Sequence, residues 1–119
     1  MKENPIKDKS LNFAIQVIEF CKILQSDKKE FVLSKQLLRS GTAIGALYRE
    51  AEHAESKKDF IHKLAIAQKE CNETMYWCEL LEKTNYMDSD TFALLNNNAV
   101  ELIRLLTSII KTAKASINN

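Results

Sequence analysis

The sequence predicts an all-α protein, an antiparallel four-helix bundle of up-down-up-down topology. Apolar residues recur at helical spacing in four segments, and short polar stretches separate these segments. The chain of 119 residues contains only two glycines and one proline, while 45% of its residues are hydrophobic and 28% are charged. This composition is typical of a helical globular protein, and the length suits one domain that covers residues 1–119.

The first helix is predicted at residues 9–26, and it carries two apolar edges. The edge that we take as the core face consists of Leu11, Ala14, Ile15, Ile18 and Cys21. The other edge consists of Phe13, Val17, Phe20 and Leu24. The second edge makes the apolar face wider than one core contact needs, so it predicts either a contact with another subunit or a broad core. The polar tails, residues 1–7 and 116–119, are expected to be mobile.

The second helix is predicted at residues 34–54, with Ser34 as its N-cap. One face of this helix carries Leu37, Gly41, Ile44, Tyr48 and Ala51. Together Gly41 and Gly45 cost about 2 kcal/mol of helix propensity relative to alanine. Close approach of a neighbouring helix would compensate for this cost.

The third helix is predicted at residues 57–83, because Ser56 and Asp59 have the spacing of a capping box. Its apolar stripe is Phe60, Leu64, Ala67, Cys71, Thr74, Cys78 and Leu81. Asp88 can cap a fourth helix at residues 88–117. The stripe of this last helix is Leu95, Ala99, Leu102, Leu106, Ile109 and Ala113.

The second and third helices form a hairpin if the chain reverses near residues 54–56. This register places both glycines level with residues 65–70, so Ala65 and Ala67 would meet Gly41 and Gly45 at a close helix contact. It also places Arg39 level with two acids one turn apart. The hypothesis is that Arg39 pairs with Glu70 or Glu73 across the hairpin.

A metal site is the alternative interpretation of the acidic residues. Glu50-x-x-His53 has the spacing of a di-iron ligand pair in a bundle, and Glu70-x-x-Glu73 adds two carboxylates. Such sites also need an inward-facing Glu from each of the other helices, whereas Glu19 and Glu101 fall on polar faces. We therefore favour a structural polar framework of Arg39, Glu50, Glu70 and Glu73, with no metal and no cofactor.

No grouping typical of nucleophilic or hydrolytic catalysis is present in the sequence. His53 and His62 are isolated, and no phosphate-binding glycine loop or nucleophile elbow occurs. Cys21, Cys71 and Cys78 form no CxxC pair and are predicted to be core residues. The sequence thus predicts a protein without enzymatic activity, and the alternative is a small metal-dependent or otherwise cryptic enzyme with Glu and His ligands.

The formal charge of +1 and the pI near 7.7 exclude a strongly basic protein that binds nucleic acid by bulk electrostatics. A local basic edge of Lys57, Lys58, Lys63 and Lys69 is interrupted by acids, which favours a solvated helix face. Tyr48, Tyr76 and Trp77 could stack on bases, although a core or subunit contact is the more common role. No apolar run is long enough to cross a bilayer and the N-terminus lacks a signal-peptide core, so a cytoplasmic location is expected.

Three segments, FVLSKQLLRS, AIGALYREA and KKDFIHKLAIAQKECNETMYWCELL, occur in this order between Phe31 and Leu81. In this pattern the chain resembles the 23S rRNA intervening-sequence proteins. The matching residues are Arg39, Ser40, Ile44, Glu50, Phe60, Ala67, Glu70, Glu73 and Trp77. At Ala43 and Leu47 the chain has apolar residues where the family usually has Ser and Asn, so roles attached to those positions do not transfer.

The resemblance implies a small bacterial bundle protein with no established enzymatic activity. Relatives look like ring-shaped homopentamers, and one notably basic branch is similar to the accessory protein of diversity-generating retroelements, which binds a reverse transcriptase and nucleic acid. We therefore expect a homopentameric scaffold whose partner is RNA or a protein such as a nucleic-acid enzyme. The expected subunit contacts are Phe13, Val17, Phe20 and Trp77.

Overall fold

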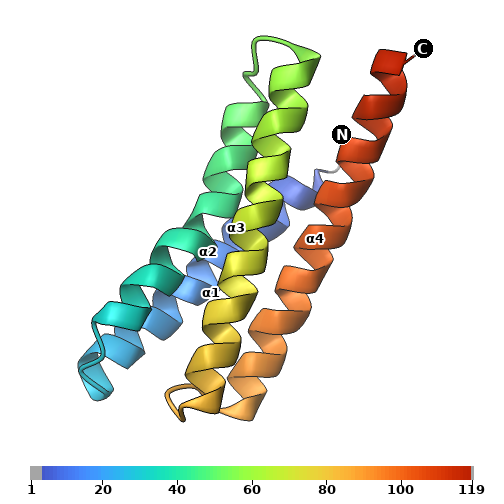
Figure 1. Ribbon diagram of the computed structural model, residues 1–119. Coiled ribbons are helices and arrows are strands. Elements are labelled where there is room, and N and C mark those ends of the chain that lie inside the picture. Colours follow the sequence, from blue (N-terminus) through green and yellow to red (C-terminus); the bar gives the residue numbers. More distant parts are fainter. Residues whose placement is uncertain (1–3, 119) are drawn as a thin grey trace.

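The computed structural model describes residues 4–118 and consists of four helices, α1 (Pro5–Asp27), α2 (Val32–Ala51), α3 (Lys57–Lys83) and α4 (Ser89–Asn118). Figure 1 shows the helices running alternately up and down in an elongated molecule that measures 52 × 28 × 23 Å. Each helix packs against two others, in the pairs α1–α2, α2–α3, α3–α4 and α1–α4. This arrangement confirms the predicted all-α four-helix bundle.

Short connections join consecutive helices at residues 28–31, 52–56 and 84–88. Lys29 and Asn85 follow the ends of α1 and α3 in the left-handed conformation, with φ of 55° and 66°. This conformation turns the next amide back to its own helix: Glu30 N donates to Leu24 O at 3.3 Å, and Tyr86 N donates to Leu81 O at 2.8 Å. The two helices therefore end sharply at the same end of the bundle.

The N-caps of α3 and α4 form as the sequence predicts. The Ser56 hydroxyl accepts from the Asp59 amide at 3.0 Å, and the Asp88 carboxylate accepts from the Thr91 amide at 2.7 Å. The latter bond favours the ionised carboxylate and lowers the pKa of Asp88. Among the described residues, none of the helices is long and apolar enough to cross a membrane.

The first two helices begin earlier than expected. Asn4 caps α1 by accepting from the Lys7 amide at 3.3 Å, Pro5 occupies the first turn, and Ile6 is buried. Of the tails expected to be mobile, residues 4–7 and 116–118 are thus ordered in or beside a helix, and residues 1–3 and 119 lie outside the described residues. At α2 the Glu30 carboxylate, rather than Ser34, caps the first turn by accepting from the Ser34 amide at 2.9 Å.

The apolar faces of α2, α3 and α4 point inward nearly as predicted, except that Ile110 rather than Ile109 is the buried residue in the last turns of α4. For α1 the prediction is right for Cys21 and wrong for most of the other residues. Phe13, Val17, Cys21 and Leu24 are at most 2% exposed and form the core face. Three side chains expected in the core are instead exposed, namely Leu11, Ile15 and Ile18, and Ala14 is half-buried. Periodicity cannot distinguish the two edges, because both are apolar.

The glycines allow a close helix contact, but with α1 rather than α3. A Cβ atom on Gly41 would lie 2.9 Å from both γ-methyl groups of Val17, and one on Gly45 would lie 3.2 Å from the Ser10 hydroxyl. The expected contact of both glycines with Ala65 and Ala67 is therefore wrong. Gly41 is two residues from Arg39, about 200° around the helix, so the two positions face different neighbours.

Candidate functional site

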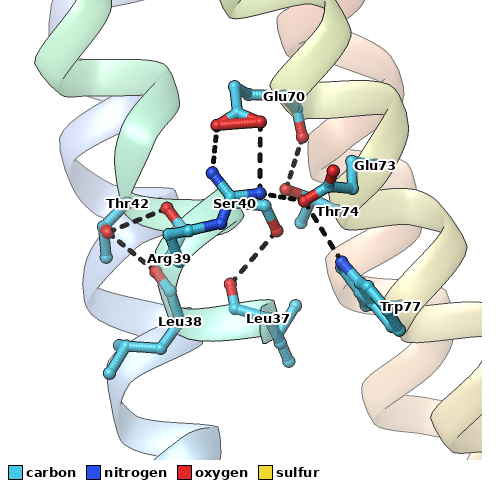
Figure 2. A network of polar contacts seen from close by, with 9 residues as sticks. All are labelled: Leu37, Leu38, Arg39, Ser40, Thr42, Glu70, Glu73, Thr74 and Trp77. Atoms are coloured by element: carbon cyan, nitrogen blue, oxygen red, sulfur yellow. Dashed lines mark hydrogen bonds and ion pairs between the residues drawn. The ribbon is translucent and has the colours of Figure 1, made fainter. Parts of the chain in front are cut away.

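A polar cluster joins α2 to α3 near the middle of the bundle (Figure 2). Arg39 donates from Nη1 and Nη2 to the two carboxylate oxygens of Glu70, at 2.6 and 3.3 Å, and Nη2 also donates to Glu73. The indole Nε1 of Trp77 donates to the same Glu73 oxygen at 3.3 Å. The Arg39 pairing expected from the hairpin register is therefore present, and it includes both acids.

The helical repeat explains how these residues meet. Glu70, Glu73 and Trp77 are spaced by three and four residues, so they follow one side of α3. A planar guanidinium can bind one carboxylate in a bidentate manner and still reach a second acceptor. The hydrogen bond to Glu70, and then the charges of both acids, raise the pKa of Arg39. The cluster is thus an interhelical clasp that fixes the α2–α3 register.

The inner side of the cluster is closed to further ligands. Ser40 and Thr74 are fully buried, and their hydroxyls donate to carbonyls of their own helices, Leu37 O at 3.4 Å and Glu70 O at 2.7 Å. No buried side-chain nitrogen or oxygen among the described residues lacks a hydrogen-bond partner. The outer side is open, because the Arg39 side chain is 52% exposed.

Glu50 lies apart from this clasp. Its carboxylate accepts from Lys63 Nζ at 3.1 Å, and this hydrogen bond raises the pKa of Lys63. Lys63 precedes Glu70 by seven residues, about 10 Å along α3. A shallow depression of about 680 Å³ surrounds the Glu50–Lys63 pair and includes His53 and Asp59 on its rim. The structure therefore separates Glu50 from Glu70 and Glu73.

Acidic, histidine and cysteine side chains are the remaining candidates for a metal site or a reactive group. Within residues 4–118 no three His, Cys, Asp or Glu side chains lie close enough together to hold a metal ion. Burial raises the pKa of Cys21 to about 11 and those of Cys71 and Cys78 to about 12, so all three thiols are protonated at neutral pH. His53 and His62 are exposed.

The other predicted site residues lie in the core or at its edge. Phe13 and Val17 are in the core, 1% and 0% exposed, so the prediction that they supply a subunit contact is wrong. Ala67 is also fully buried in the core. Phe20 and Trp77 are half-buried and pack against the edge of the core.

Sequence reasoning missed the polar contacts between α1 and α4. Lys9 pairs with Glu101 at 3.0 Å, and Asn98 donates to Gln16 at 2.9 Å. Both pairs connect residues more than eighty positions apart, and no turn fixes the register of these two helices. The complementary charge of Lys9 and Glu101 was the available signal, but it could not be used without that register.

By its fold the chain is a small four-helix-bundle protein, and an Arg–Glu–Glu clasp joins its two central helices. A family model described as 23S rRNA-intervening sequence protein matches residues 2–108. The chain therefore belongs to the 23S rRNA-intervening sequence protein family.

A solved structure supports the same assignment. The chain is similar to a protein with unknown function from the S23 ribosomal protein family of Bacteroides thetaiotaomicron, known from a crystal structure. The two chains are 55% identical, the match covers 89% of this chain and 98% of the other, and the TM-score is 0.88. A comparison with curated proteins found no match.

Proposed function

We propose that this protein is a non-catalytic oligomeric scaffold that binds RNA or a protein partner. The observation that carries the proposal is an apolar stripe on the outer face of α1. Leu11, Ile15 and Ile18 are spaced by four and three residues, and they are 50%, 45% and 36% exposed. Apolar side chains aligned in this way on a helix mark an interaction surface.

A groove beside the stripe supports a contact with a neighbouring subunit. A groove of about 210 Å³ runs between α1 and α2, where Ala14, Thr42 and Ala46 leave room for a side chain. The apolar stripe and the groove lie side by side, so the stripe of one copy can fill the groove of the next. Such a heterologous contact closes into a ring when the rotation between copies allows it. The family resemblance favours five subunits.

The charge of the chain and the pairing of its acids bear on two parts of the proposal, RNA binding and the absence of catalysis. A single chain with a formal charge of +1 attracts RNA weakly, whereas a ring repeats each weak contact and raises the overall affinity through avidity. The carboxylates of Glu70 and Glu73 are engaged by Arg39, and Glu50 is engaged by Lys63. This pairing supports a structural rather than a catalytic role for the acidic framework.

The test is the mass in solution of the wild type and two matched variants. Light scattering at micromolar concentration should give a multiple of 13.6 kDa for the wild type. Ile15→Asp places a charge in the stripe and should yield the monomer with unchanged helix content. Val32→Asp, at a 72% exposed position outside the stripe, should assemble as the wild type does. A monomeric wild type would refute the oligomeric scaffold.

The partner is tested separately. For RNA, titration of the assembled protein with structured RNA should give an affinity that falls as salt rises, and Ile15→Asp should bind more weakly through the loss of avidity. An affinity that does not depend on salt would reject RNA. Proteins recovered with the intact oligomer from its native host would then identify the partner.

A further inference from the structure

An apolar groove lies at the end of the bundle where α2 ends and α3 begins, on the side of the last turns of α4. It has a volume of about 650 Å³, within the usual range for a small-molecule site. Phe60, Ile109 and Ala113 line it, together with the small side chains Ala51 and Ala54. The small side chains leave a depression between the packed helices. One slender apolar group can enter this depression.

The rim of the groove carries a positive charge. Lys57 Nζ donates to the Ser116 hydroxyl at 2.7 Å and forms no salt bridge within residues 4–118. Glu52, the acid on the rim, is paired with Lys7 at 3.4 Å. The charge of Lys57 is therefore not compensated by an acid of the groove. An apolar groove with one such ammonium group at its edge complements a ligand with an apolar tail and one anionic group.

We propose that this groove binds a medium-chain fatty acid. The alkyl chain lies along Phe60, Ile109 and Ala113, and the carboxylate accepts from Lys57 Nζ and the Ser116 hydroxyl. The lining of α4 from Ser108 to Ser116 extends about 12 Å along the helix, which suits a single alkyl chain of medium length. No residue of α1 lines the groove, so this site is independent of the subunit contact proposed above.

Chain length and head group provide the first test. Calorimetric titration with hexanoate, octanoate and decanoate should show an affinity that rises with each added methylene, with about fourfold per methylene as the upper bound for complete burial of a CH₂ group. Octanol, which has the same tail as octanoate but no charge, should bind about tenfold more weakly, because it cannot form a charge-assisted hydrogen bond with Lys57. Equal affinity for octanol and octanoate, or no dependence on chain length, would overturn the proposal.

Matched variants provide the second test. Lys57→Gln should weaken octanoate about tenfold and leave octanol unchanged, whereas Lys58→Gln, on the adjacent residue outside the groove, should have no effect. Thr112→Trp should block the groove, and Lys111→Trp, one residue away, should not. Both tryptophans replace exposed residues, so circular dichroism should show folded bundles. Octanoate binding that survives Thr112→Trp, or that Lys58→Gln weakens as much as Lys57→Gln does, would refute this site.

Discussion

Replacement of Gly41 by alanine adds a methyl group at a point where α1 and α2 are already in contact. The new Cβ would lie 2.9 Å from both γ-methyl groups of Val17 and 3.3 Å from its Cβ. Because two methyl groups are involved, rotation about χ1 of this fully buried valine exchanges one close contact for another. The helices must therefore move apart, which costs about 2–3 kcal/mol as overpacking.

The net effect includes the better helix propensity of alanine, a gain of about 1 kcal/mol. Gly41→Ala should thus lower the free energy of unfolding by about 1–2 kcal/mol, equivalent to a fall in Tm of roughly 4–8 °C. Gly45→Ala is the matched control, because its Cβ would meet only the Ser10 hydroxyl at 3.2 Å and then atoms at 3.5 Å or more. There the propensity gain offsets the contact, so the stability should stay the same or rise slightly.

Urea denaturation followed by circular dichroism measures both variants. The double variant Val17→Ala/Gly41→Ala completes a thermodynamic cycle, since Val17→Ala removes the methyl groups that the new Cβ would meet. The double variant should be more stable than the sum of the single changes by about 0.5–3 kcal/mol. A Gly41→Ala protein as stable as the wild type, or a loss of equal size at Gly45, would refute the contact between Gly41 and Val17.

Two further predictions concern the clasp and the thiols. Arg39→Gln should lower the free energy of unfolding by about 1 kcal/mol in low salt, and this loss should shrink in high salt. Arg39→Lys should not restore the stability, because lysine lacks the bidentate fork. A loss of stability that does not depend on salt would contradict the clasp. Burial raises the thiol pKa values from 9.0 to about 11–12. The contribution of the thiols to the free energy of unfolding should therefore be complete below pH 9 and fall as the pH rises from 9 to 12. The slope should be at most about 1.4 kcal/mol per pH unit for each thiol. Urea titrations at several alkaline pH values should show this slope flatten when alanine replaces Cys21, Cys71 and Cys78, and an unchanged slope would refute it.

The sequence was sufficient for three of the helix faces. On α3, Leu64, Cys71 and Leu81 belong to one apolar stripe with polar residues opposite, so periodicity identifies the inner face without ambiguity. On α1 two apolar edges compete, and only packing against the other helices reveals that Val17 points inward and Ile15 outward. The decisive quantity there is the volume available at each core position, which a single sequence does not contain.

The polar clasp and the glycine contact show what the register of the hairpin can predict and what it cannot. Arg39 could be paired with Glu70 and Glu73 because a short turn fixes the register of α2 and α3. The same register was wrongly applied to Gly41, although the helical repeat places this residue on the side opposite Arg39. Combining register with angular position would have assigned the glycine to α1. Contacts between α1 and α4 had no such constraint, since these helices are adjacent in space but not in sequence.

The order of the helix pairs has a consequence for how the chain assembles. Three of the four interfaces join helices that follow one another along the chain, so each can form as soon as a short loop closes. The interface between α1 and α4 forms only when the first and last helices of the chain come together. Its polar contacts are the exposed ion pair Lys9–Glu101 and the hydrogen bond between Asn98 and Gln16. We therefore expect the α1–α4 interface to form after the three interfaces between consecutive helices.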